Sequence, residues 1–386
     1  MKEFLNWPSM EPFYVPDEVY ANYKAYAERG AETEEKWNAL FAEYCGKYPE
    51  MKELWDKFYN PNLANDVYDS EDYWAFEDKP DATRSLSGKQ LQKLKNLMPN
   101  LIGGAADLAP STKTYMADMG DFSKDNYAGR NLHFGVRELA MSAIGNGLML
   151  HGGLRAFVST FFVFSDYTKP MARLSALMGV PLTFVFTHDS IGVGEDGPTM
   201  SIEQLAMLRA MPNFHVYRPA DATETAAAWY SAVSSKKTPT ALVLTRQNLP
   251  QLAGSSKEAL KGAYILEDSA KEVPDAIIIA TGSEVELAVG AKAELAKEGV
   301  DVRVVSMPSM DVFEEQPEDY KEKVLPKAVR KRVAVEALGD FGWGRYVGLD
   351  GTTVTMKGFG ASAPAGQLFK KFGFTVENVV AAVKSL

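Results

Sequence analysis

Cysteine and histidine are scarce in this chain of 386 residues. The single cysteine, Cys45, excludes an internal disulfide framework and suits a reducing compartment, so we expect a cytoplasmic protein. The histidines lack the His-x-x-x-His spacing and the paired cysteines of common metal sites. They stand at positions 133, 151, 188 and 215. We therefore expect this chain to bind no metal.

Long apolar runs and an excess of positive charge are absent as well. No apolar stretch approaches the roughly 18 residues that a membrane-spanning helix requires. The first residues, MKEFLNWPSMEPF, have Glu, Asn and two prolines where a signal peptide needs an apolar core. The 51 acidic residues outnumber the 41 basic ones, for a net charge of −10. This balance argues against nucleic-acid or membrane partners, but it permits a local basic site for a small phosphorylated substrate.

The length predicts a globular protein of two or three domains. Residues 1–80 have a helical character, because Trp37, Leu40, Phe41 and Tyr44 recur at the spacing of one helical face. A second stripe with the same spacing follows. We interpret this segment as a helical linker whose aromatic stripes pack in a core or against another domain.

Short apolar runs alternate with helical segments over residues 81–252. PNLIGGAAD, PLTFVFTHD, NFHVYRPAD and PTALVLTRQ are typical of buried strands, and the alternation predicts βαβ units with a parallel sheet. The polar residues that end these runs are Asp107, His188, Arg218 and Arg246. Ligands of open α/β sheets bind outside the carboxyl ends of the strands, so these side chains are expected to share a pocket rim. Polar residues that simply begin a loop are the alternative.

A segment containing Gly and Ser, residues 252–262, is predicted to be a linker. A second α/β unit over residues 263–386 follows, with strands predicted in DAIIIATGSEVELA, DVRVVSMPS and KRVAVEALG. The predicted fold class is α/β. It comprises two doubly wound domains with mostly parallel sheets, residues 81–252 and 263–386, preceded by the helical linker of residues 1–80.

Glu138 stands at the head of an otherwise apolar helical stretch within NLHFGVRELAMSAIGNG. From Leu139 onward the residues are small or apolar, which suits a helix buried on most sides, where an unpaired carboxylate costs several kcal/mol. A structural explanation exists, because an acid in the first turn complements the helix dipole by about 0.3–1 kcal/mol and Arg137 could pair with it. The alternative is a functional role.

Two further stretches are candidates for ligand binding. HDSIGVGEDGPTM begins at His188 and combines glycines, which allow close approach to a ligand, with four titratable side chains. An ordinary polar loop is the alternative. In TFFVFSDY, Phe161, Phe164 and Tyr167 recur every three residues. That spacing fits core packing or a pocket that holds a flat heterocycle.

Together these motifs resemble those of the transketolase family. GGAADLAPS, HFGVRELAM, STFFVF with Tyr167, HDSIGVGEDGPT and LTRQNL occur in the family's order and spacing, and the resemblance covers nearly the whole chain. It implies thiamine diphosphate as the cofactor, with a pyrimidine-binding domain in residues 81–252 and the family's C-terminal domain after it. It also implies transfer of a two-carbon ketol unit between sugar phosphates, as in the pentose phosphate pathway.

The resemblance implies a set of cofactor contacts. Glu138 matches the glutamate that hydrogen-bonds N1′ of the aminopyrimidine ring and promotes loss of the C2 proton of the thiazolium ring. Phe161, Phe164 and Tyr167 match the aromatic pocket around the pyrimidine. The other implied cofactor contacts are Asp107 and Leu108.

A sugar-phosphate site is implied in the same way. Arg84, Ser111 and Arg246 match positions that hold the phosphate, for which a planar guanidinium is well suited. His188, counted with Glu138 as catalytic, matches a residue at the phosphate end. Asp196 matches a residue that binds a substrate hydroxyl.

The sequence departs from the family in two respects. Met200 occupies a position that usually carries a substrate-contacting histidine, and a thioether cannot donate that hydrogen bond. The G-D-G motif that begins the diphosphate and Mg²⁺ site does not occur. We therefore expect the diphosphate-binding domain, with its Mg²⁺, on a separate partner chain, in a homodimer or heterotetramer. The isolated chain is expected to be inactive.

Three alternatives remain. The beta subunit of a 2-oxo acid dehydrogenase has the same two domains, but Arg84 and Arg246 favour a sugar phosphate. Deoxyxylulose phosphate synthase is a less similar relative. A non-catalytic remnant or assembly partner is consistent with Met200 and the missing domain, and less consistent with Glu138 and the aromatic stretch.

Overall fold

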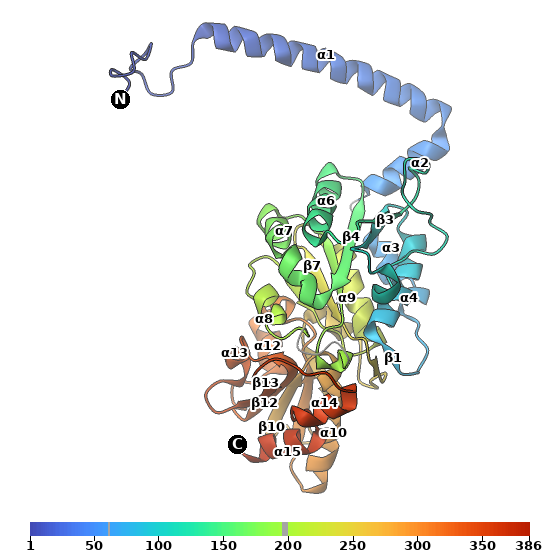
Figure 1. Cartoon of the computed structure of the whole chain (residues 1–386), viewed down its shortest axis with the longest axis vertical. Helices are drawn as coiled ribbons and strands as arrows, with labels where there is room; N and C mark the ends of the chain where they lie inside the picture. The colour runs from blue at the N-terminus through green and yellow to red at the C-terminus, as the bar shows by residue number, and fades with distance from the viewer. Residues whose placement is uncertain (61, 195–199) are drawn as a thin grey trace. The chain divides into compact units, whose positions relative to one another are not determined.

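The computed structural model describes residues 1–60, 62–194 and 200–386. The chain divides into two compact units, Met1–Phe58 and Tyr59–Leu386 (Figure 1). Over the described residues, no helix combines the length and the apolar character needed to cross a membrane.

The first unit contains helix α1 (Asp17–Lys47) and most of α2 (Pro49–Tyr59), which confirms the predicted helices. Neither helix buries a residue. The rings of Trp37 and Phe41 stack with centroids 5.0 Å apart, and Phe41 contacts Trp55 at 4.9 Å. Trp37 nevertheless remains 50% exposed. The aromatic stripe is therefore not part of a core in the described chain.

Six parallel strands form the first sheet of the second unit, in the order β3-β2-β4-β5-β7-β6. They are β2 (Leu101–Ala105), β3 (Asn131–His133), β4 (Arg155–Phe161), β5 (Thr183–Thr187), β6 (His215–Tyr217) and β7 (Thr240–Leu244). One face carries α4 (Thr83–Leu97) and α9 (Ala222–Ser234); the other carries α6 (Glu138–His151), α7 (Ser165–Met178) and α8 (Gln204–Arg209). Helices on both faces require strands without a polar side, and every residue of β5, TFVFT, is buried.

The second sheet has the order β13-β12-β10-β11-β9, with only β9 antiparallel. Its strands are β9 (Tyr264–Glu267), β10 (Ala276–Ala280), β11 (Val302–Ser306), β12 (Arg332–Gly339) and β13 (Thr352–Met356). One face carries α10 (Val285–Lys297) and α15 (Val376–Lys384); the other carries α11 (Met310–Glu314), α12 (Glu318–Val324) and α13 (Gly344–Val347). The predicted α/β class with two mostly parallel sheets is confirmed.

Three short elements bear on the candidate site. They are β1 (Asp81–Ala82), β8 (Asn248–Leu249) and α5 (Ala109–Thr112). Strands β1 and β8 pair antiparallel with each other, apart from the two large sheets. All three elements lie next to residues that the sequence marks as candidates for ligand binding.

Buried ion pairs join the elements of the two sheets. Arg218, directly after β6, is fully buried and pairs with Asp189 and with Glu284. Arg209 of α8 donates two hydrogen bonds of 2.9 Å to the carboxylate of Glu336 in β12. The prediction that Arg218 lies on a pocket rim is wrong, because its guanidinium is buried and pairs with one carboxylate from each of the two sheet regions. We call the packed region between the two sheets the joint.

Replacing Arg218 with methionine should lower the free energy of unfolding by about 3–5 kcal/mol, because Asp189 and Glu284 would stay buried without their cation. Arg330→Met is the matched control: Arg330 pairs with Asp350 on the surface, where such a pair contributes about 0–1 kcal/mol. Urea denaturation of both variants measures the difference. Equal losses of stability would contradict the role given to Arg218.

Candidate active site

Two arginines that are far apart in the sequence meet beside the β1–β8 pair. The Thr83 amide donates to Oγ1 of Thr245 at 3.1 Å, and the Thr245 amide donates to Oγ1 of Thr83 at 2.7 Å. Arg84, in the first turn of α4, and Arg246, just after β7, are the next residues along the chain. Burial and the nearby charge of Arg246 lower the pKa of Arg84. The pair of guanidinium groups forms a local basic site in an otherwise acidic chain.

His188 lies beside both arginines, directly after β5. Its Nε2 is 3.4 Å from Nη1 of Arg84, and its Nδ1 is 2.8 Å from Oγ1 of Thr187. A guanidinium only donates, so Nε2 is the acceptor and we assign the ring proton to Nδ1. Burial, together with the charges of Arg84 and Arg246, lowers the pKa of His188 to about 3. The imidazole is therefore neutral at physiological pH and adds no charge of its own.

Several buried polar atoms at this site lack a hydrogen-bond partner among the described residues. They are Nε of Arg84 and both amide heteroatoms of the Gln247 side chain. Gln247 packs on Gly192, where an added Cβ would come within 2.2 Å of its Nε2. An unsatisfied buried polar group costs about 1–3 kcal/mol, so a polar ligand here would remove that cost. Gln247 was missed in the sequence, although it directly follows Arg246 in the LTRQNL motif.

Glu138 is the first residue of α6 and is only 9% exposed. Oγ1 of Thr160 lies 3.5 Å from its Oε1, at the limit of a hydrogen bond. Arg137 instead donates to the carbonyl oxygen of Phe134 at 3.1 Å. Within the described ranges Glu138 has no ion-pair partner, so the suggested pair with Arg137 is not formed. The favourable contact with the helix dipole remains.

A row of aromatic rings connects Glu138 to the basic site. Phe161 directly follows the threonine that contacts Glu138, and its ring centroid lies 3.8 Å from that of His188. The Phe161 and Phe164 rings are nearly parallel, with an interplanar angle of 9° and centroids 6.1 Å apart. Tyr167 continues the row 6.1 Å beyond Phe164 and is 60% exposed. The row thus offers ring faces between a carboxylate and two guanidinium groups.

The end of β2 lies next to the same residues. Asp107 has a left-handed backbone with φ of 61°, uncommon for a residue other than glycine, and lines a cavity of 360 Å³. Leu108 is the N-cap residue of α5. Within α5, the carbonyl oxygen of Ser111 accepts a hydrogen bond of 2.9 Å from Nη1 of Arg84. The backbone around Ser111 therefore helps to orient the Arg84 guanidinium.

Two more residues were singled out in the sequence, Asp196 and Met200. Asp196 lies outside the described residues. Met200 is 5% exposed and packs in an apolar cluster that includes Val193 and Ile202. Among the described residues, no group of three or more His, Cys, Asp and Glu side chains is placed to hold a metal ion.

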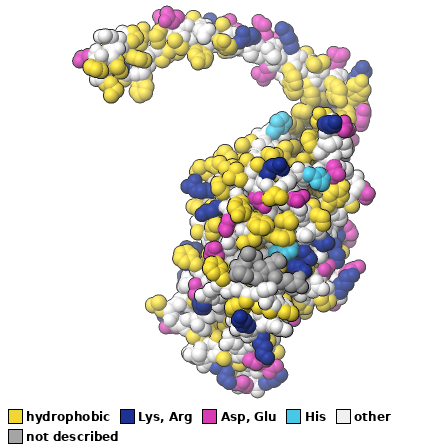
Figure 2. All heavy atoms as spheres, viewed as in Figure 1, with side chains coloured by type: hydrophobic (Ala, Val, Ile, Leu, Met, Phe, Trp, Pro, Cys, Tyr) yellow, Lys and Arg dark blue, Asp and Glu magenta, His cyan; other side chains and the backbone are white. Residues whose placement is uncertain are grey.

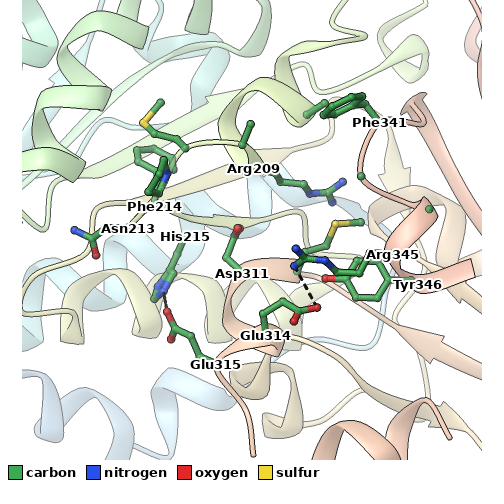
Figure 3. Close-up of a pocket in the computed structure, with 17 residues that line it drawn as sticks. Arg209, Asn213, Phe214, His215, Asp311, Glu314, Glu315, Phe341, Arg345 and Tyr346 are labelled. Carbon is green, nitrogen blue, oxygen red and sulfur yellow. Dashed lines mark hydrogen bonds and ion pairs between the residues drawn. The ribbon is translucent and has the colours of Figure 1, made fainter. Parts of the chain in front are cut away.

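A larger cavity of 610 Å³ lies at the joint of the two sheets, and none of the predicted site residues lines it (Figure 3). It is bounded by α8 and β6 on one side and by α11 and α13 on the other. His215 pairs with Glu315 at 2.9 Å, and Arg345 pairs with Glu314 at 3.6 Å. Burial raises the pKa of Asp311, in the same cavity, to about 6. These residues belong to the joint and not to the candidate active site.

Family models match three segments of the chain. Residues 1–63 match "Transketolase, thiamine diphosphate binding domain", residues 79–251 match "Transketolase, pyrimidine binding domain", and residues 262–375 match "Transketolase-like TK C-terminal domain". The expectation that the chain lacks the diphosphate-binding domain is not supported, because the first of these segments matches that domain.

Individual relatives agree with these matches. Transketolase of Bacillus subtilis is 53% identical over 391 residues, which cover 100% of this chain and 58% of that protein. The crystal structure of Pichia stipitis transketolase with sedoheptulose 7-phosphate has a TM-score of 0.90 at 42% identity, covering 97% of this chain and 56% of that one. The chain therefore spans less than two thirds of the length of these relatives.

A shorter solved structure is similar over most of its length. It is described as a split gene transketolase, inactive beta4 tetramer. Its TM-score is 0.61 at 27% identity, and the match covers 79% of this chain and 97% of that one.

The imidazole NMR signals of His188 should not titrate between about pH 5 and pH 8, because burial and two guanidinium groups hold its pKa at about 3. Arg84→Met should raise that pKa, since it removes one of the nearby positive charges. Arg330→Met, a change at an exposed ion pair, should leave it unaltered. A wild-type His188 that titrates near the ordinary pKa of histidine would contradict the burial and charge described for it.

Asp311→Asn should increase stability above about pH 6 by about 1–3 kcal/mol, and the gain should shrink as pH falls and vanish below about pH 4, the ordinary pKa of an unfolded aspartate. The folded-state pKa is raised to about 6, so folding favours the protonated acid and the free energy of unfolding falls as pH rises towards 6. Asparagine keeps an acceptor for the Val216 amide, which now donates to Asp311. Denaturation measured at several pH values tests this; a gain that does not depend on pH would refute it.

Proposed function

We propose, on the premise that the chain belongs to the transketolase family, that it supplies the pyrimidine-binding side of a thiamine diphosphate-dependent transketolase. The completed enzyme transfers a two-carbon ketol unit between sugar phosphates. One observation carries the proposal. A nearly buried carboxylate, a row of aromatic rings and a pair of arginines follow one another at the carboxyl ends of the same parallel sheet.

Glu138 and the aromatic row suit the aminopyrimidine end of the cofactor. Glu138 has no ion-pair partner among the described residues and receives only a long contact from Thr160, so its carboxyl group is available to a ring nitrogen. Phe161, Phe164 and Tyr167 offer ring faces for stacking. When bound, thiamine diphosphate supplies the electron sink for the ketol transfer. The role proposed for Glu138 is to hold a proton at the pyrimidine.

The arginines suit the phosphate end of the sugar. Arg84 and Arg246 supply two fixed positive charges, and the neutral His188, whose Nε2 accepts from Arg84, helps to place that guanidinium without adding a third charge. Nε of Arg84 and the Gln247 amide lack partners among the described residues and would gain them from an oxygen-rich ligand. The Pichia stipitis relative is described in complex with such a ligand, sedoheptulose 7-phosphate.

The remainder of the diphosphate-binding domain, with its Mg²⁺ site, is proposed to come from a second polypeptide. The 386 residues contain no G-D-G motif, and residues 1–63 match the model of that domain. A similar shorter chain is described as part of a split gene transketolase and as inactive in its beta4 form. We expect this chain to be inactive alone and to act in a homodimer or a heterotetramer.

The direct test is a transketolase assay with thiamine diphosphate and Mg²⁺. The chain is assayed alone and mixed with the N-terminal part of Bacillus subtilis transketolase that has no counterpart in it. Activity is expected only in the mixture. Glu138→Gln should lower that activity by about 10²–10⁴-fold without loss of the fold, because the amide cannot hold the catalytic proton.

Glu286→Gln is the matched control, since Glu286 also lies in the first turn of a helix but is exposed. Equal activities of the Glu138→Gln and wild-type mixtures would contradict the role of Glu138. If the mixture has no transketolase activity although both polypeptides are folded and bound to each other, this chain is better explained as a non-catalytic assembly partner.

Arg246→Ala should raise KM for phosphorylated sugars by about 10- to 100-fold, the effect of losing one charge-assisted hydrogen-bonding group. KM for hydroxypyruvate, which carries no phosphate, should change little. Arg330→Ala serves as the control for loss of a positive charge elsewhere on the chain. If Arg246→Ala affects both substrates equally, Arg246 does not bind the phosphate.

A further inference from the structure

The turn Ile191–Val193 joins the candidate active site to the second sheet. The carbonyl oxygen of Val193 accepts a hydrogen bond of 3.3 Å from Nη1 of Arg246. The side chain of Val193 is only 4% exposed and belongs to the apolar cluster that contains Val335 of β12 and Leu368. A single residue of this turn therefore contacts a site arginine through its backbone and packs in the core around the second sheet through its side chain.

The segment before helix α14 (Ala365–Lys371) holds the end of this turn. Helix α14 packs against the turn, and the amide of Ala363 donates a hydrogen bond of 3.1 Å to the carbonyl oxygen of Gly194. Gly194 has a φ of 85°, which residues with a side chain rarely adopt. A Cβ at Gly194 would lie 3.1 Å from the carbonyl oxygen of Ala363. The two backbones approach each other closely, and a side chain at position 194 would separate them.

Further contacts hold the rest of this stretch. The middle of the turn packs on Gln247, since a Cβ at Gly192 would overlap the side-chain amide of that residue. The chain just before the turn is fixed as well, because the fully buried Asp189 pairs with Arg218. Nη1 of Arg218 donates to the carbonyl oxygen of Thr281, directly after β10, at 2.9 Å. Contacts with the second sheet region therefore hold this stretch at both ends.

The local placement of guanidinium groups decides where this acidic chain can hold an anion. Figure 2 shows basic side chains spread among acidic and hydrophobic ones over the visible face. An arginine side chain in solvent samples many rotamers, so a fixed acceptor that selects one of them lowers the entropy cost of binding a ligand. The carbonyl oxygen of Val193 is such an acceptor for Arg246.

We propose that the C-terminal domain, residues 262–375, positions Arg246 of the candidate active site. The contact between Ala363 and Gly194 fixes the carbonyl oxygen of Val193, which in turn orients the guanidinium group toward an anion of the phosphate class. Ala363 is a positioning residue, because it acts through the turn without touching the anion. This inference rests on the proposed function, which places the sugar phosphate at Arg246.

The test removes the amide donor of Ala363 and leaves Arg246 in place. Ala363→Pro lacks the N–H group that donates to Gly194. Ala363→Ser keeps that group and is the matched control. Gly194→Ala disturbs the same contact from the other side, because its Cβ would crowd Ala363. The full chain is used throughout, and urea denaturation checks that each variant is folded. If Ala363→Pro does not fold, Gly194→Ala replaces it.

Inorganic phosphate is the probe, titrated into the chain alone. Its binding is followed by the NMR signals of the His188 imidazole, which lies beside Arg84 and Arg246. Wild type and Ala363→Ser should bind phosphate with the same Kd. Ala363→Pro and Gly194→Ala should bind it about 3- to 10-fold more weakly, the range expected when one hydrogen bond of a site is lost.

The same substitutions in an Arg246→Ala background separate positioning from a merely structural role. Arg84 remains in that background to bind phosphate. If Ala363 acts through Arg246, Ala363→Pro should have no further effect on Kd once that arginine is gone. An equal weakening in both backgrounds would overturn the inference, because the contact would then serve the fold. An affinity of Ala363→Ser as low as that of Ala363→Pro would overturn it too.

Failure of the proposed function gives a different pattern of affinities. Weakened binding by Arg246→Ala together with wild-type binding by Ala363→Pro overturns the inference alone. Wild-type binding by Arg246→Ala removes Arg246 from the phosphate site and overturns both proposals. If the wild-type chain does not bind phosphate, the inference is overturned, and the KM comparison for Arg246→Ala in the completed enzyme still decides the proposed role of that arginine.

Discussion

The reciprocal hydrogen bonds between Thr83 and Thr245 hold together the parts of the candidate active site. They fix the start of α4 against the end of β7, although 162 positions separate the two residues. Arg84 and Arg246 are brought together as a result. Their charges, added to burial, keep His188 neutral. A basic site made in this way is local, which is how a chain with a net charge of −10 can still present positive charge to an anionic ligand.

Much of the fold could be predicted because its signals are local. Buried strands such as TFVFT are apolar throughout, and their alternation with helices allows few arrangements other than a parallel sheet. The polar residues at strand ends were recognisable because each directly follows an apolar run in the sequence. Arg218 shows the limit of this reasoning. It ends a strand as His188 and Arg246 do, but Glu284, one of its partners, lies beyond the linker, and no local pattern reveals that pairing.

The candidate site could be predicted residue by residue only through the resemblance to a family. Composition and spacing left Glu138 open to a purely structural explanation, and only its surroundings show that the pair with Arg137 is not formed. Gln247 was missed because a glutamine that follows an arginine does not form a recognisable sequence motif. The stretch with the aromatic stripe was predicted correctly as a helix, but the expected packing of that stripe in a core is not seen in the described chain, where α1 buries no residue.

A crystal structure of this chain with a diphosphate-binding partner, thiamine diphosphate, Mg²⁺ and a sugar phosphate would test the central claim most directly. The account predicts that the Glu138 carboxyl group lies within about 2.6–3.2 Å of N1′ of the pyrimidine ring. It also predicts that the sugar phosphate lies between Arg84 and Arg246. A pyrimidine ring bound away from Glu138, or a phosphate that contacts neither arginine, would contradict it.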